Sequence, residues 1–319
     1  MSAEVRVDPI SGLKTIIAAG RAERPGGWLT HEPLPPIDPV QDPFLPGHED
    51  QTTAELYRDG TPWRVRVFTN LYPVLEPIAG APERDAYPDL FTAQPAIGAH
   101  ELIVNSPEPV HSLSDLTLDQ LALAVETWRL RMREHAGAAC VQLFVNEGRD
   151  SGATLPHTHA QLVALDFVPA AVAREREHFH AYAVRTMGGN LLADLVQEEV
   201  RRRERIVAID SEAVLMAPYA SRAPFHLLLA PRRARARFED DGSTGAALLH
   251  DALRRLKARL GAIPPLNLWL RTAPSGAEHF GWRIEILPRL TNLGGLELGT
   301  GVNVCILPPE TAAAELRDL

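Results

Sequence analysis

Short apolar runs alternate along this chain with longer stretches of helical spacing. The runs are bounded by turn residues and predict strands at 13–18, 63–68, 100–104, 141–145, 225–230 and 266–270. Helical spacing covers 117–135, 172–205 and 244–261, and Thr117 and Gln120 form a capping box at the start of the first of these. This succession predicts an α/β protein, for which 45% hydrophobic residues supply an ample core.

The order of these elements occurs twice. Strand, helix, strand, loop and strand follow one another between 97 and 165, and the same order returns after 225. Ser151-Gly152-Ala153 recurs as Ser275-Gly276-Ala277, and an offset of 124 lays 151–165 on 275–289 without a gap. A chance match of three residues is the alternative. We predict two related halves, 1–170 and 171–319.

The segment 155–161 carries the chemistry that this sequence suggests most strongly. His157, His159 and Gln161 alternate, so an extended chain places all three side chains on one face. Imidazole is a nucleophile toward phosphorus, and an amide donates to phosphoryl oxygens as charge develops there. The alternative is a strand with two half-exposed histidines. In the second half the matching residues are Gly281, Arg283 and Glu285, which restricts a nucleophilic histidine to the first half.

Three other polar segments are candidates for binding phosphate or a nucleotide. Arg21 and Arg24 precede Pro25-Gly26-Gly27 in a loop suited to a polyphosphate, unless it is simply a solvated turn. Asn70 ends the strand at 63–68 and suits a ribose or base, or merely a turn. The glycine-bearing loop 146–152 offers backbone N–H groups to an anion, together with the Thr154 hydroxyl.

Bulk properties exclude several classes of protein. A net charge of −9 over 319 residues argues against a general binder of nucleic acid or of acidic membranes. The two cysteines form no disulfide framework, and no apolar leader or membrane-length segment is present, so we expect a cytoplasmic protein.

These motifs together resemble the histidine-triad superfamily, and more closely its galactose-1-phosphate uridylyltransferase branch, in which two such halves are fused. The resemblance rests on segments 21–25, 42–50, 67–70, 155–161, 218–225, 284–290 and 297–301. It implies an α/β (α+β) fold of two histidine-triad-like halves, with mostly antiparallel sheets, packed helices and one continuous core. It also implies a homodimer.

The resemblance assigns roles to individual residues. His159 would be the nucleophile that forms a nucleotidyl-histidine intermediate, and Gln161 would bond the phosphoryl oxygens. Nucleotide or phosphate contacts are implied for Arg21, Arg24, Asn70, Asn146, Gly152, Thr154 and His157. Arg283 and Glu297 belong to the part expected to reach the sugar or acceptor.

The sequence departs from this family at its zinc site. Many relatives have Cys-Pro-Phe-Cys where Asp42 and Leu45 stand here, and Pro109 replaces a ligand histidine. Leucine and proline side chains cannot ligate a metal, so we expect no zinc and no cofactor. His157, the fourth ligand in relatives, becomes a structural histidine or a phosphate contact. Arg283 replaces a histidine of the family, and either a phosphate contact or pairing with a carboxylate is open to it.

The expected reaction is nucleotidyl transfer from a nucleoside diphosphate sugar to a sugar 1-phosphate, in two steps through His159. Two alternatives remain open at this point. One is a phosphorylase or hydrolase of ADP-sugars or dinucleoside polyphosphates, which differs only in the acceptor. The other is a nucleotide-binding homologue without turnover.

Overall fold

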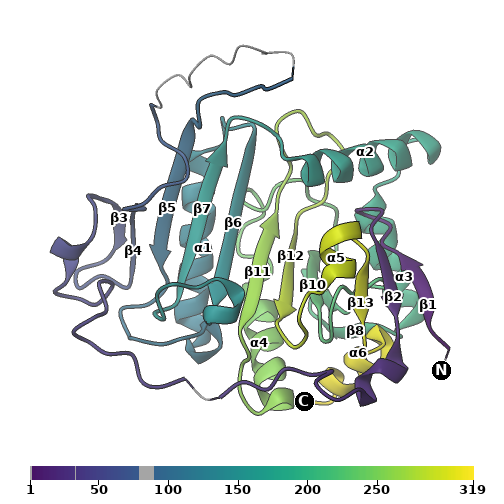
Figure 1. Ribbon diagram of the computed structural model, residues 1–319. Coiled ribbons are helices and arrows are strands. Elements are labelled where there is room, and N and C mark those ends of the chain that lie inside the picture. The colour runs from purple at the N-terminus through teal and green to yellow at the C-terminus, as the bar shows by residue number, and fades with distance from the viewer. Residues whose placement is uncertain (1, 33, 79–89) are drawn as a thin grey trace.

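A ten-stranded sheet forms the centre of the molecule in the computed structural model, which describes residues 2–32, 34–78 and 90–319 (Figure 1). Five strands come from the first part of the chain: β3 (Glu55–Asp59), β4 (Val65–Thr69), β5 (Gly98–Val104), β6 (Cys140–Glu147) and β7 (His159–Leu165). Five follow later: β8 (Ile206–Ile209), β9 (Ala213–Met216), β10 (Leu227–Pro231), β11 (Leu266–Arg271) and β12 (Arg283–Pro288). A separate small sheet joins β1 (Glu4–Val7), β2 (Lys14–Ile17) and β13 (Asn303–Cys305).

The strand order of the large sheet shows that it consists of two equivalent halves. The order is β3-β4-β5-β7-β6 followed by β11-β12-β10-β9-β8, and β6 and β11 are the antiparallel strands that join the halves. In one half Leu102 of β5 lies opposite Gln161 of β7, and in the other Leu228 of β10 lies opposite Glu285 of β12. This register agrees with the offset of 124 found in the sequence. The expected α/β fold of two fused halves is confirmed.

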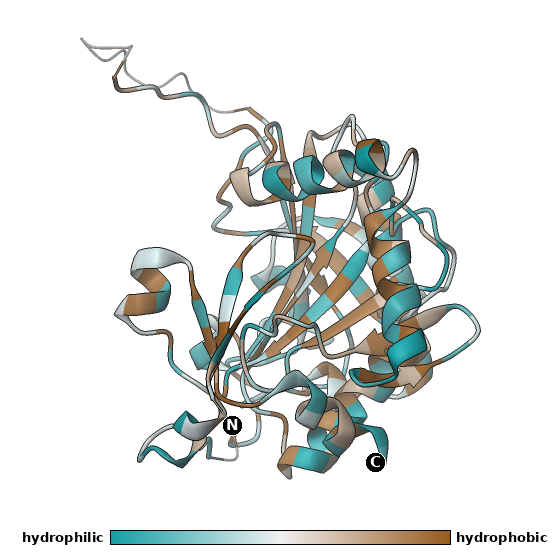
Figure 2. Cartoon of the chain, turned by 90° about the vertical axis from the view of Figure 1, so that its right-hand side faces the viewer, coloured by the Kyte–Doolittle hydropathy of each residue, from teal (hydrophilic) through white to brown (hydrophobic). Residues whose placement is uncertain are grey.

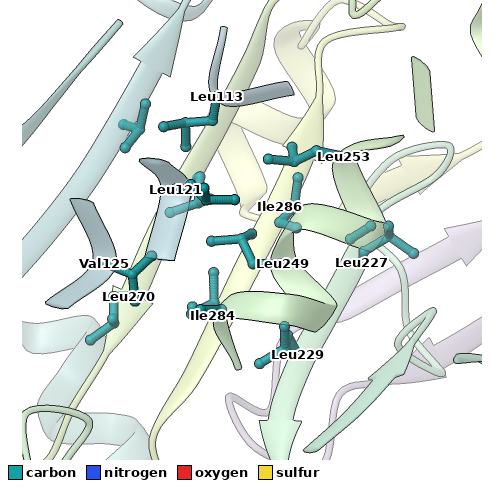
Figure 3. Packing of buried hydrophobic residues seen from close by; sticks show 14 of the residues in the cluster. Leu113, Leu121, Val125, Leu227, Leu229, Leu249, Leu253, Leu270, Ile284 and Ile286 are labelled. Carbon is teal, nitrogen blue, oxygen red and sulfur yellow. The ribbon is translucent and has the colours of Figure 1, made fainter. Parts of the chain in front are cut away.

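Helices cover the two faces of this sheet unequally. On one face lie α1 (Leu118–Glu134), α4 (Ala246–Leu260) and α6 (Pro309–Arg317), which pack their apolar sides into a core shared by both halves. Figure 3 shows this core, with side chains of α1 and α4 meeting those of β10, β11 and β12. The helices carry apolar and polar residues on opposite sides, whereas the central strands are largely apolar (Figure 2).

On the opposite face, the helices found among the described residues lie over the second half. There α2 (Ala170–Arg185) and α3 (Leu191–Arg202) pack on β9 and β10 through a second apolar cluster that includes Phe179 and Leu192. Over the first half, the same face carries a small cluster of Phe44, Trp63 and Phe68 with residues of β5. The segment around Phe44, rather than a helix, therefore lies beside the start of β7.

Most predicted elements are confirmed, and the differences have local causes. Thr117 caps α1 by accepting the Gln120 N–H, as the capping box predicts. The single helix expected over 172–205 is wrong, because the chain turns at Gly188, which has a φ of +107°, and restarts at Asn190, the side-chain cap of α3. The expected boundary at 170/171 coincides with the start of α2 and stays a prediction. Among the described residues, no helix is both long and apolar enough to cross a membrane.

Candidate active site

His159 is the first residue of β7, and its ring is held in a form suited to nucleophilic attack. Its Nδ1 lies 2.8 Å from the carbonyl oxygen of His157, so Nδ1–H donates there and Nε2 keeps its lone pair. Burial lowers the pKa of His159 below its usual value, which keeps the ring neutral near pH 7. Nε2 makes no hydrogen bond within the described residues, and it is not among their buried unpartnered atoms. It is therefore available to a substrate.

Gln161 follows His159 by two residues, so both side chains lie on the same face of β7, and Gln161 is partly exposed. Its Oε1 is 3.0 Å from Nε2 of His100 on β5, and Nδ2 of Asn70 is 3.2 Å from the same nitrogen. The structure thus brings Asn70 close to Gln161, and the nucleotide contact expected of Asn70 stays a prediction. It also adds His100, which the sequence reasoning missed as a candidate, although two ionisable residues at the start of an apolar strand, His100 and Glu101, were a signal.

Asn146 and the loop that follows it lie beside His159. Because Val145 pairs with Ala160, Asn146 is opposite His159 in the sheet. Asn267 of β11 donates from Nδ2 to Oδ1 of Asn146 and to the carbonyl oxygen of Ser151, at 2.8 Å in both cases. Asn267 was not predicted, and only the pairing of β6 with β11 brings it there.

The loop turns at Gly152, whose φ of +92° favours glycine, and a Cβ at this position would lie 3.7 Å from Nδ2 of Asn146. Thr154 is exposed two residues later. The predicted loop residues Asn146 and Gly152 therefore lie together beside the start of β7.

His157 precedes β7 rather than belonging to it, so the alternation predicted for the motif holds only for His159 and Gln161. His157 is fully buried, with Nδ1 2.7 Å from the Asp42 carboxylate and Nε2 2.9 Å from the carbonyl oxygen of Ser106. Both partners accept hydrogen bonds only, so both ring nitrogens donate and the ring is an imidazolium paired with a carboxylate. Although burial opposes it, the hydrogen bond from His157 holds the pKa of Asp42 below its usual value.

This arrangement does not fit a zinc ion. Zinc needs an unprotonated ring nitrogen, and both nitrogens of His157 are already used. Leu45 and Pro109 provide no ligand atoms. Across residues 2–32, 34–78 and 90–319, no three histidine, cysteine or acidic side chains are grouped to hold a metal ion.

Arg21, Arg24 and Glu297 lie apart from this site in the single chain. The two arginines are exposed in a short 3-10 helix, η1 (Ala19–Glu23), and directly after it. This helix follows β2 of the small sheet. The small sheet lies beside the second half of the large sheet, whereas β7 belongs to the first half (Figure 1). Glu297 lies in α5 (Gly295–Thr300), where its carboxylate accepts the Gly294 N–H at 2.9 Å.

Arg283 takes the second of the two roles left open for it, namely pairing with carboxylates. It is 1% exposed, and its guanidinium lies 2.9 Å from both Glu175 of α2 and Glu285. Burial opposes the charge, but these two carboxylates still raise the pKa of Arg283. Its expected contact with a sugar or acceptor stays a prediction. At Gly281 an added Cβ would lie 2.6 Å from Leu192, so α3 leaves no room for a side chain there.

A two-half sheet with a neutral histidine and an amide at the start of β7 defines a histidine-triad-like protein of the fused type. The chain belongs to the galactose-1-phosphate uridyl transferase family, because the model of that family's N-terminal domain matches residues 1–169. Residues 114–318 also match a domain of unknown function. The resemblance found in the sequence is thereby confirmed.

Individual relatives match almost the whole chain. ADP-glucose phosphorylase of Arabidopsis thaliana is 28% identical over all of this chain and 93% of that protein. Galactose-1-phosphate uridylyltransferase of Haemophilus influenzae is 28% identical over 98% of this chain and 93% of that protein. The crystal structure of the Arabidopsis phosphorylase with bound ADP-glucose superimposes with a TM-score of 0.83 at 26% identity, covering 100% of this chain and 99% of that one.

Proposed function

We propose that this protein transfers a nucleotidyl group from a nucleoside diphosphate sugar through a covalent intermediate on His159. The observation that carries the proposal is the ring of His159, whose Nδ1–H is bound to a backbone carbonyl while Nε2 is unprotonated and unpartnered within the described residues. A histidine held in this way is prepared to attack phosphorus. The fixed tautomer of His159 also argues against a homologue that only binds nucleotides, because binding alone does not require it.

The reaction has two steps, and each exchanges one bond at phosphorus. In the first, Nε2 of His159 bonds to the α-phosphorus while the bond from that phosphorus to the bridging oxygen breaks, and the sugar 1-phosphate leaves with the electron pair. In the second, an oxygen of the acceptor phosphate bonds to the same phosphorus and the N–P bond breaks, which regenerates His159. Gln161 donates to the phosphoryl oxygens in both steps, and one such donor is worth about 10²–10³ in rate.

Two acceptors fit this scheme. A hexose 1-phosphate gives nucleotidyl exchange, as the name of the Haemophilus influenzae relative describes for that protein. Inorganic phosphate gives phosphorolysis, and similarity over the whole chain to ADP-glucose phosphorylase favours this second candidate for an ADP-sugar donor. The chemistry at His159 is identical in both, so the donor and the acceptor must be identified by experiment.

The experiment is a substrate panel read by intact-protein mass spectrometry. UDP-glucose, ADP-glucose and a dinucleoside polyphosphate are each added without acceptor, and the expected result is one nucleotidyl group on the wild-type protein and none on His159→Gly. Adding phosphate or galactose 1-phosphate to the isolated adduct then identifies the acceptor by which of the two removes it. An adduct that persists in His159→Gly would refute the assignment of the nucleophile, and binding without an adduct would support the non-catalytic alternative.

We also propose that the enzyme works without zinc and as a homodimer. The buried pair of Asp42 and His157 supports the first point, because it occupies the ring nitrogens that a metal would need. Elemental analysis of the purified protein should find less than about 0.1 zinc per chain, and chelation should leave the rate of adduct formation unchanged.

The position of Arg21 and Arg24, away from β7 in one chain, supports the proposed homodimer, because a second copy would be the source of these arginines. Light scattering of the purified protein tests it.

A further inference from the structure

His100 is a buried histidine beside the proposed active site, and its hydrogen bonds define where its proton lies. It is 6% exposed on β5, and its Nδ1 accepts the backbone N–H of Val74 at 3.2 Å. A ring nitrogen that accepts carries no proton, so the proton of His100 is on Nε2. Two groups face this Nε2–H, namely Oε1 of Gln161 at 3.0 Å and Nδ2 of Asn70 at 3.2 Å. Only the first can accept, so His100 donates to Gln161.

This hydrogen bond fixes the orientation of the Gln161 amide. With Oε1 bound to His100, the NH₂ group points away from β5, and it makes no hydrogen bond within the described residues. If the amide were reversed, the N–H of His100 would face the NH₂ groups of both Gln161 and Asn70 and would lose its acceptor. His100 therefore leaves both N–H groups of Gln161 free for the phosphoryl oxygens of a substrate on His159.

The second half of the sheet contains a histidine at the equivalent position. Because Leu102 pairs with Gln161 and Leu228 with Glu285, His100 and His226 occupy corresponding places two residues before these leucines. Nδ1 of His226 accepts the backbone N–H of Arg222 at 3.2 Å, and its Nε2 lies 3.2 Å from Oε2 of Glu285. Each half thus places a histidine of backbone-fixed tautomer against the residue at the Gln161 position, but Nε2 of His226 forms no hydrogen bond within the described residues, whereas that of His100 does.

The two partners differ in a way that matters for chemistry. Both oxygens of the Glu285 carboxylate are acceptors, so His226 does not need to orient it. The amide of Gln161 has one accepting and one donating end, so its orientation decides whether it can stabilise a phosphoryl group. We propose that His100 is a positioning residue for nucleotidyl transfer, which acts by orienting Gln161. This inference rests on the proposed function.

The experiment measures the single-turnover rate of adduct formation on His159, with its half-saturating concentration, using the nucleotide sugar that labels the wild-type protein. His100→Leu replaces the imidazole by an apolar side chain of similar size, which has no N–H to donate to Gln161. We expect its maximal rate to fall about 10-fold, less than the 10²–10³ expected for loss of the Gln161 donor itself, with the half-saturating concentration within about twofold. His100→Gln, whose amide N–H reaches the place of Nε2, should restore most of the rate.

A double-mutant comparison separates this role from a merely structural one. In the Gln161→Ala background, His100→Leu should cause no further loss beyond about twofold, because the group it orients is gone. His226→Leu is the matched control, a similarly buried histidine directly before the corresponding strand, and should stay within about twofold of the wild-type rate. A 10-fold loss from His100→Leu in both backgrounds, or a wild-type rate in His100→Leu alone, overturns the inference. If the wild-type protein forms no adduct, the proposed function fails first and this inference fails with it.

Discussion

Replacement of Asp42 by alanine should destabilise the protein by about 3–5 kcal/mol, the usual cost of removing one member of a buried ion pair. The carboxylate is 2% exposed and the ring of His157 is fully buried, so water cannot replace the lost partner. Oδ2 of Asp42 receives the 2.7 Å hydrogen bond from His157, and Oδ1 accepts the Phe44 N–H at 3.0 Å. The alanine variant leaves both of these buried donors unpaired.

The asparagine variant separates the charge from the hydrogen bonds. An asparagine side chain has nearly the same volume as the aspartate, and its one carbonyl oxygen still accepts from one of the two donors. Asp42→Asn should therefore cost about 1.5–3 kcal/mol, in the range of a hydrogen bond to a charged group. Asp166→Ala, at an exposed aspartate, is the control and should change stability by no more than about 0.5 kcal/mol.

Urea denaturation followed by circular dichroism measures all three variants, and the rate of adduct formation on His159 is recorded for the folded proteins. The rate should fall in Asp42→Ala, because the backbone carbonyl of His157 holds the ring of His159. A loss of less than about 1 kcal/mol in Asp42→Ala would show that the pair is not a structural substitute for the metal. Stability that depends on added zinc would refute the metal-free interpretation.

Two further predictions concern pH. Because burial lowers the pKa of His159, the rate of adduct formation should be maintained as the pH falls through 6.5 and decline only below it, and a decline centred above pH 6.5 would contradict this. Burial also raises the pKa of Glu147 to about 7 from an ordinary 4.5, so the folded state binds more protons than the unfolded state between these values. The free energy of unfolding should therefore fall, by about 3 kcal/mol through this residue alone, as the pH rises from 4.5 to above 7. Urea midpoints at pH 5 and pH 8 should show this decline in the wild-type protein and a smaller one in Glu147→Gln; equal declines would refute it.

Local patterns in the sequence predict the helices and strands whose formation depends on residues close together in the chain. The capping box at Thr117 and the alternation around His159 and Gln161 act over a few residues, and the structure contains α1 and β7 where these patterns place them. The break after α2 was also local, since Gly188 and Gly189 precede Asn190, but the continuing helical spacing on both sides concealed it.

Contacts between segments that are distant in the sequence could not be predicted from local patterns. The sequence indicates that Leu45 and Pro109 cannot bind zinc, but not that Asp42 and His157, 115 positions apart, form a buried hydrogen-bonded pair. His100 lies 61 positions before Gln161, and Asn267 lies 121 positions after Asn146. The last two pairs depend on which strands become neighbours and in which register, and the first depends on where the segment around Phe44 packs; no short stretch of sequence contains this information.

The distribution of helices over the described residues distinguishes the candidate site in the first half of the sheet from the equivalent place in the second. His159 and Arg283 occupy equivalent places on β7 and β12, on the same face of one continuous sheet. Over β12 this face is closed by α2, because Glu175 forms a buried ion pair with Arg283. Over β7 no helix of the described residues lies on this face, and Gln161 and Asn146 stay partly exposed. A histidine in place of Arg283 would therefore be shielded from a phosphorylated substrate, so the arginine tethers α2 at a position where a nucleophile would have no access to phosphorus.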